Sequence, residues 1–246
     1  DYLHPVKVNS DDFFKKASSY NCDLFVSMSF NQIFRDRIIN VPKLKTINCH
    51  AGKLPFYRGR NILNWALING EDELGITVHY VDEGIDTGDI ILQRCFDIKE
   101  DDTYKDLLEI AYLECANILY DAIKLIQKND FTVQKQSEIH PVGFYCGRRG
   151  EGDEIINWNQ SSKDIYNFIR AICEPGPRAR SFINGKEIKI NKSRLIAKAP
   201  SYKGTVGQIL AKTSNGFLIK TQDTFIEILE IENNVRLKVG DKLKGI

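Results

Sequence analysis

The first fifty residues alternate short apolar runs with stretches of helical periodicity, and this alternation restricts the possible folds more than any other feature. Apolar runs of strand length occur at 6–8, 22–28 and 44–49, and helical patterns fill the intervals at 10–20 and 34–39. The middle run is almost entirely apolar, as expected of a strand that is covered on both faces of a sheet. Strands that alternate with helices predict a doubly wound, mostly parallel α/β sheet.

The pattern continues for another hundred residues and then fades. Helices are expected at 61–69 and 102–127, and strands at 76–81 and 90–98. Residues 129–152 lack a clear period and predict a linker.

A second, smaller domain is predicted after the linker. A helix at 161–173 precedes four alternating runs, which predict a β-barrel-like (OB-like) domain: 181–190, 204–212, 216–221 and 225–231. We therefore expect a first domain over 1–150, linker included, and a helix plus barrel-like domain over 151–246. Because the chain opens at Asp1 inside a strand-like run, we also expect that an N-terminal part of the first domain is missing.

Charge and cysteine content exclude several classes of protein. The formal net charge is +1, which gives no general attraction to nucleic acid or anionic lipid. Residues 151–246 carry 16 Lys and Arg against 11 Asp and Glu, an excess typical of a solvated surface. The six cysteines form no C-x-x-C pair, which predicts free thiols in a reduced, cytoplasmic protein without a zinc site. No apolar run is long enough to span a membrane, and no signal peptide is present in the sequence.

An amide, an imidazole and a carboxylate form the strongest chemical pattern. Asn48 and His50 are two residues apart at the end of an expected strand, so both side chains lie on one face. Ligands bind at that end of the strands in open parallel sheets. With a later carboxylate from the acidic loop 82–89, these groups suffice to stabilise an oxyanion, move a proton and hold an imidazole in place, which indicates acyl transfer. The alternatives are a turn-forming Asn, a surface His and a solvated Asp. We expect His79 to be structural.

Three segments, in this order and spacing, resemble the formyltransferases that use 10-formyltetrahydrofolate: Asn48-x-His50, Leu54-Pro55-x-Tyr57-Arg58-Gly59 and Asp86-Thr87-Gly88. This family includes methionyl-tRNA formyltransferase, glycinamide ribonucleotide transformylase and the sugar-nucleotide N-formyltransferases. The stretch 57–67 and the Gly147-Arg148-Arg149 element look most like the sugar-nucleotide branch, especially the dTDP-4-amino-4,6-dideoxyglucose formyltransferases. The chain departs from the family at Gly52-Lys53, where many relatives have Ser-Leu, and in lacking a recognisable first βαβ unit.

The resemblance implies roles for individual residues. His50 would take the proton of the acceptor amine, Asn48 would donate to the formyl oxygen, and Asp86 would orient His50 or relay the proton. The co-substrate 10-formyltetrahydrofolate is expected to lie against Phe30, Asn31, Gln32, Ile33, Phe34 and Asp82, and no metal is needed. Substrate contacts are expected from Lys53, Tyr57, Arg58, Arg60, Arg148 and Arg170, because guanidinium groups offer forked donors to a pyrophosphate.

We therefore expect a cytoplasmic enzyme that formylates a nucleotide-linked amino sugar for O-antigen or lipopolysaccharide synthesis. The resemblance implies a homodimer that binds a nucleotide-sugar substrate. We expect neither a nucleic acid nor a membrane as a partner. The first alternative is methionyl-tRNA formylation, for which the terminal domain is only mildly basic. An alternative of another class is a nucleic-acid-binding module on an inactive scaffold, but the aromatic residues of the terminal domain are scattered.

Overall fold

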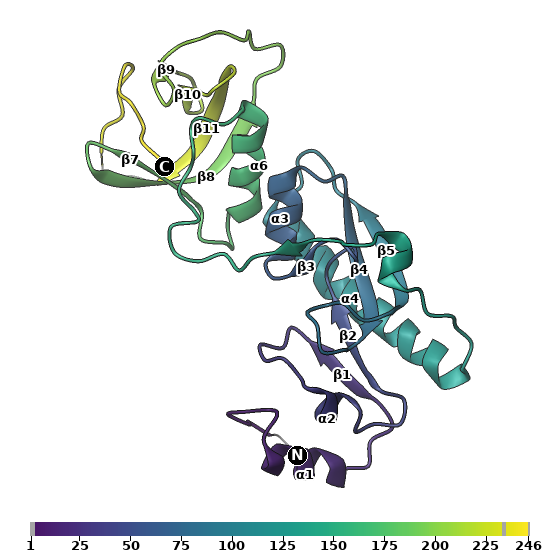
Figure 1. The fold of residues 1–246 in the computed structure, drawn as a ribbon. Coiled ribbons are helices and arrows are strands. Elements are labelled where there is room, and N and C mark those ends of the chain that lie inside the picture. The colour runs from purple at the N-terminus through teal and green to yellow at the C-terminus, as the bar shows by residue number, and fades with distance from the viewer. Residues whose placement is uncertain (1–2, 233–234, 246) are drawn as a thin grey trace. The chain divides into compact units, whose positions relative to one another are not determined.

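The computed structural model describes residues 3–232 and 235–245, and the chain divides into two compact units (Figure 1). Unit 1 comprises residues 1–62, 73–97 and 109–148, and unit 2 comprises residues 63–72, 98–108 and 149–246. Each unit is therefore assembled from separate stretches of the chain.

Unit 1 is built on a four-stranded sheet of order β1-β2-β4-β5. The strands are β1 (Phe25–Met28), β2 (Thr46–His50), β4 (Glu73–Tyr80) and β5 (Ile90–Asp97). The expected α/β alternation is present, but the sheet is mixed, since β1 and β2 run parallel while β4 is antiparallel to both β2 and β5. For β4 and β5 the physical reason is that only the short loop 81–89 joins them, whereas a parallel pair needs a long crossover.

One face of this sheet packs against a long helix, α4 (Tyr104–Lys128), of which residues 109–128 belong to unit 1. The buried side chains of this core come from β2, β4, β5 and α4: Ile47, Cys49, Ile76, Val78, Ile91, Ile118, Ala122 and Ile126. Because successive side chains of a strand point to opposite faces, Asn48 and His50 lie on the face of β2 away from this core.

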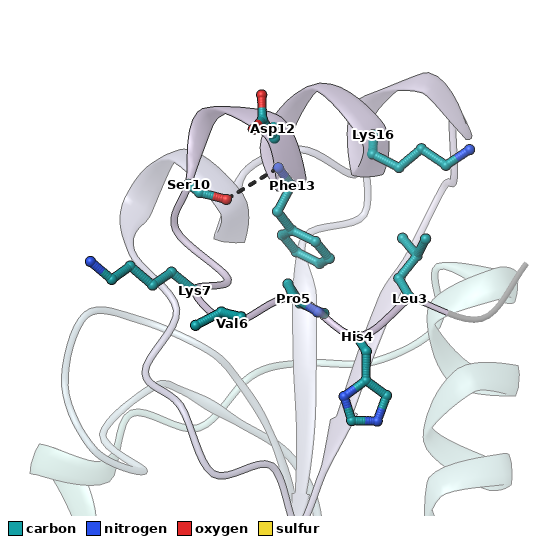
Figure 2. A pocket seen from close by; sticks show the side chains of 9 residues that line it. All are labelled: Leu3, His4, Pro5, Val6, Lys7, Ser10, Asp12, Phe13 and Lys16. Carbon is teal, nitrogen blue, oxygen red and sulfur yellow. Dashed lines mark hydrogen bonds between the residues drawn. The ribbon is translucent and has the colours of Figure 1, made fainter.

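The N-terminal stretch differs from expectation at one point. Helix α1 (Asp11–Ser19) is present and starts at its N-cap Ser10, whose hydroxyl accepts from the Phe13 N–H at 3.3 Å. The strand expected at 6–8 is absent, because those residues turn into the helix through a bond from Ser10 N to Lys7 O, and Val6 is 91% exposed. An open hollow of about 450 Å³ lies between this stretch and α1, and Phe13 and Lys16 help to line it (Figure 2).

Strand β1 is covered on only one face, which corrects the expectation that the run at 22–28 is buried on both. Its burial alternates along the strand, and Val26 and Met28 are 47% and 43% exposed. A short helix, α2 (Asp36–Ile39), follows and buries Ile38 and Ile39. The apolar run therefore predicted the strand correctly, but the prediction that both of its faces are buried was wrong.

The connections after β2 and α4 meet in a small parallel ladder. Strand β3 (Arg58–Gly59) pairs with β6 (Tyr145–Cys146), although almost ninety residues separate them in sequence. Helix α5 (Gln136–Ile139) lies on the stretch that leads to β6. This ladder brings the 58–59 loop and the 136–146 stretch together.

Unit 2 contains a five-stranded antiparallel sheet of order β7-β8-β11-β10-β9. Its strands are β7 (Ala179–Ile183), β8 (Lys186–Leu195), β9 (Ile209–Lys212), β10 (Phe217–Lys220) and β11 (Phe225–Glu232). The run predicted as one strand at 181–190 is a hairpin, since Asn184 and Gly185 both take left-handed backbone conformations with φ of 49° and 76°. Two such residues form the tight turn that this connection needs.

The C-terminal segment closes this sheet into the barrel-like form predicted from the sequence. Lys244 bridges Phe182 of β7, and Lys242 bridges Gln208 just before β9, so the segment lies between the two edge strands. Helix α6 (Ser162–Ile172) packs on β8 and is capped by Ser161, while helix α3 (Ile62–Asn69) contributes most of its residues to this unit. Among the described residues, no helix is long and apolar enough to span a membrane.

Candidate active site

Three elements of unit 1 bring the predicted catalytic residues together. Asn48 and His50 end β2, and Asp86 lies in the loop that joins β4 to β5. In the antiparallel ladder, Asn48 stands directly opposite His79 of β4. The structure thus adds a second histidine to the group, because cross-strand neighbours lie only about 5 Å apart.

The ring of His50 is held by a backbone carbonyl. Its Nε2 lies 2.7 Å from the carbonyl oxygen of Tyr57, and its Nδ1 lies 3.6 Å from Oδ2 of Asp86. A carbonyl oxygen only accepts hydrogen bonds, so Nε2 carries the proton, and the lone pair of the neutral ring is on Nδ1. The nitrogen that is able to accept a proton therefore faces Asp86.

Gly52 is required for this arrangement. A Cβ atom at position 52 would lie 2.5 Å from both His50 Nε2 and the Tyr57 carbonyl oxygen. Such a contact is far inside van der Waals distance, so any larger residue would separate the two bonded groups. In this chain, then, the contact between His50 and Tyr57 depends on glycine at position 52.

Asp86 is fixed by bonds to its carboxylate. The Gly59 N–H donates to Oδ2 at 2.9 Å, and the Asn48 amide lies 3.5 Å from Oδ1. The backbone at Asp86 is left-handed, with φ of 53°, a conformation that non-glycine residues seldom adopt. Burial alone would raise the pKa of this carboxyl, but the neighbouring His79 and His50 rings and the Gly59 N–H lower it, so Asp86 is a carboxylate at neutral pH.

The pKa of His50 is lowered, first because burial disfavours its charged form and also because His79 lies nearby. Attraction to Asp86 and the bond to Tyr57 offset part of this effect. The ring is therefore neutral near pH 7, as a group that accepts a proton must be.

A buried glutamine links the Asp86 loop to the 58–59 loop. Gln136 Nε2 donates to the carbonyl oxygens of Asp86 and Gly88, both at 2.8 Å, and its Oε1 accepts from Arg58 Nε and Nη2 at 3.0 and 2.6 Å. Arg58 also donates to Val142 O, so its buried guanidinium bonds to the protein itself. These donors of Arg58 hold the loop that carries Asp86, and the expected contact of Arg58 with substrate stays a prediction.

Replacing Gln136 with leucine is expected to destabilise the protein by about 1–3 kcal/mol. The two carbonyl groups and the Arg58 guanidinium would lose a buried partner, and no water can easily reach them. Urea unfolding measures the change in free energy. The matched control is Gln134→Leu, since Gln134 is exposed and its printed bonds with Ile90 use only its backbone; equal effects of the two substitutions would contradict this account.

The other residues expected to contact substrate are divided between the two units. In unit 1, Lys53 pairs with Glu73 at 2.6 Å, and the exposed Arg60 donates to Asn31 O at 3.4 Å. The ring of Tyr57 is buried and packs edge-on against Phe144 at 4.8 Å.

Two further arginines belong to different environments. Arg148 is exposed at the end of unit 1. Arg170 of unit 2 is buried, and its guanidinium donates to the Asn167 side chain and to the carbonyl oxygens of Lys99 and Asp102. The expected contact of Arg170 with substrate likewise stays a prediction.

The segment expected to bind folate presents apolar side chains to solvent. Phe30 and Ile33 are 45% and 50% exposed, and Phe30 stacks on Phe34 with ring centroids 5.0 Å apart. Gln32 accepts from the Val8 N–H through its side chain. These exposed rings suit a flat aromatic ligand.

Asp82 serves its own loop, since its Oδ1 accepts from Gly84 N at 3.0 Å and from the Thr87 hydroxyl at 2.6 Å. Within the described ranges, no group of three or more His, Cys, Asp or Glu side chains is arranged to hold a metal ion.

Comparison with known proteins places both units in one family. Residues 2–123 match the family described as formyl transferase, and residues 150–245 match the formyl transferase C-terminal domain. A methionyl-tRNA formyltransferase from Clostridium acetobutylicum is 35% identical over 246 residues, which is 99% of this chain and 78% of that protein.

Two solved structures are also similar. One is WlaRD, a sugar 3N-formyl transferase crystallised in the presence of dTDP and 5-N-formyl-THF, at 30% identity and a TM-score of 0.67 over 89% of this chain and 77% of that one. The other is an N-formyltransferase from Helicobacter canadensis in complex with folinic acid and dTDP-3-aminofucose, at 28% identity and a TM-score of 0.63 over 85% and 73% of the two chains.

Proposed function

This chain belongs to the formyl transferase family, and we propose that it transfers the formyl group of 10-formyltetrahydrofolate to the primary amine of methionyl-tRNA. The observation that carries the chemistry is the grouping of Asn48, His50 and Asp86, with the lone-pair nitrogen of a neutral His50 facing a carboxylate. An amide donor beside a proton acceptor suits attack of an amine on a carbonyl carbon.

The reaction needs no group beyond these residues and the two substrates. The amine nitrogen forms a bond to the formyl carbon, and the formyl oxygen gains negative charge that an Asn48 N–H stabilises. His50 Nδ1 takes the proton that the amine loses, while the carboxylate of Asp86 stabilises the imidazolium. The bond from the formyl carbon to N10 of the folate then breaks, and the proton ends on N10 as tetrahydrofolate leaves.

Methionyl-tRNA is the acceptor that the sequence relatives support. The similarity to the Clostridium acetobutylicum enzyme runs over 99% of this chain and so includes both units. In addition, Arg58 and Arg170, two of the groups assigned to a pyrophosphate, donate to the protein itself. The expectation of a nucleotide-sugar partner without nucleic acid therefore moves to second place.

A nucleotide-linked amino sugar is the second candidate acceptor. The observation that favours it is the similarity to two sugar N-formyltransferase structures, one crystallised with dTDP and the other with a dTDP-amino sugar. Under this alternative the exposed Arg60 and Arg148 are the remaining forked donors for the pyrophosphate.

The folate donor is proposed to use the exposed apolar stretch around Phe30 and Ile33. The solved relatives at 28–30% identity were crystallised with 5-N-formyl-THF or folinic acid, which supports a reduced folate as the donor. The homodimer expected from the sequence stays a prediction.

One experiment with each acceptor in turn distinguishes the two candidate functions. Purified protein is incubated with 10-formyltetrahydrofolate and either methionyl-tRNA or dTDP-, UDP- and GDP-linked amino sugars, and products are weighed by mass spectrometry. We expect a formyl mass on the methionine of the tRNA, with binding that weakens steeply as salt rises. Formylation of a sugar alone selects the second candidate. No formyl product on any acceptor would overturn both.

A further inference from the structure

We propose that His79 is a positioning residue that determines which end of the Asn48 amide faces the reacting groups; this deepens the proposed function and rests on it. His79 lies on β4 directly opposite Asn48 and is only 2% exposed. From the sequence we expected His79 to be structural, but its contacts distinguish it from an ordinary buried histidine.

The tautomer of His79 is fixed by a backbone carbonyl. Nδ1 lies 2.7 Å from the carbonyl oxygen of Tyr80, an atom that only accepts hydrogen bonds. The ring proton of neutral His79 is therefore on Nδ1, and the lone pair is on Nε2. His50 has the opposite tautomer, because its Nε2 bonds to Tyr57 O. The inner nitrogens of the two rings thus face the two oxygens of Asp86, at 3.6 Å for His50 Nδ1 and 3.5 Å for His79 Nε2.

This tautomer fixes the direction of the Asn48 amide. Asn48 Nδ2 lies 3.2 Å from His79 Nε2, so one amide hydrogen is donated to the imidazole lone pair. With the amide reversed, its oxygen would face that lone pair and the carboxylate of Asp86, and both contacts would be repulsive. His79 therefore keeps the NH₂ group, and not the carbonyl oxygen, directed at the site.

The second amide hydrogen is the one left for the substrate. Its contact with Asp86 Oδ1 is long, at 3.5 Å, which is weak for a hydrogen bond. A formyl oxygen that gains charge is a better acceptor at normal distance, so this hydrogen is free to stabilise the transition state. One hydrogen of the Asn48 NH₂ group thus bonds to His79 Nε2, and the other is available to the formyl oxygen.

Two substitutions test the inference through kinetics. His79→Leu fills similar space without an acceptor, whereas His79→Gln offers an amide oxygen to Asn48. We expect His79→Leu to lower kcat by about 10- to 100-fold with the KM values for donor and acceptor changed less than about twofold. His79→Gln is expected to recover most of the lost rate. Equal losses of kcat in both variants, in proportion to a loss of thermal stability, would mean that His79 only supports the fold.

A second readout does not depend on catalysis, so it separates this inference from the proposed function. In protein labelled with ¹⁵N-histidine, long-range ¹H–¹⁵N correlations should show His79 protonated on Nδ1 and His50 on Nε2. The side-chain NH₂ of Asn48 should exchange slowly with water in the native protein and His79→Gln, and faster in His79→Leu. A His79 protonated on Nε2 alone would overturn the inference, even in an enzyme that formylates its acceptor.

Discussion

Replacing His50 with alanine is expected to lower kcat by about 10²–10⁴-fold, the usual contribution of a positioned general base. The substitution removes His50 Nδ1, the proposed proton acceptor, which lies 3.6 Å from Asp86 Oδ2. The side chain is only a tenth exposed, so thermal unfolding of the variant is measured alongside its kinetics to separate loss of the base from loss of the fold. Steady-state kinetics with saturating donor and acceptor measure the effect.

A matched control makes the His50 result specific. His4 is exposed at the N-terminal hollow, and His4→Ala should leave kcat unchanged. Tetrahydrofolate binding, measured by fluorescence titration, should persist in His50→Ala. A kcat within threefold of the native value in His50→Ala would exclude this histidine as the base.

The second large effect is expected from Asp86→Asn, which should lower kcat by about 10²–10⁴-fold, by comparison with carboxylate loss beside other catalytic imidazoles. The variant removes the negative charge that stabilises protonated His50. Because the Gly59 N–H keeps the amide oxygen on its side, the new NH₂ group would compete with Asn48 for His79 Nε2. Both consequences act on the transition state more than on substrate binding.

The pH profile of this variant has a defined sign. Attraction to Asp86 raises the pKa of His50 against the stronger effect of burial, so its loss should lower that pKa further. The acid limb of kcat/KM, which follows protonation of the base, should therefore move to lower pH in Asp86→Asn. Glu83→Gln removes one charge from the same loop at an exposed position and should move neither kcat nor the acid limb. A shift toward higher pH in Asp86→Asn would contradict the assignment of His50 as the base.

The grouping of Asn48, His50 and Asp86 was predictable from local patterns together with the family resemblance, and their catalytic roles stay a prediction. Two polar residues two apart at the end of an apolar run must share a face, and the Gly-rich loop after a strand is a natural place for Asp86. No such pattern identified His79. Its role depends on the antiparallel register that sets it against Asn48, and strand register is not a local property.

The role of Gln136 and the surroundings of Arg58 and Arg170 were not predictable for a related reason. A lone glutamine after a linker has no pattern that identifies it, and its four bonds join groups up to 78 residues away. Arg58 has the side chain that a phosphate site would use, but its surroundings decide whether the fork reaches a ligand or the chain itself. The hydrogen-bond partners of Gln136 and Arg58 are distant in sequence, so only the structure could identify them.

The Gln136 contacts have a consequence for where the smallest working fragment ends. The stretch that matches the catalytic family finishes at residue 123, yet the atoms that hold the Asp86 loop and pair with β3 come from Gln136 and from Tyr145–Cys146. A fragment that stops at residue 123 would contain Asn48, His50 and Asp86 but lack the side chain and the strand that hold the neighbouring loops. Truncation at the boundary of the family match would therefore remove the support of the site while leaving its proposed reacting groups in place.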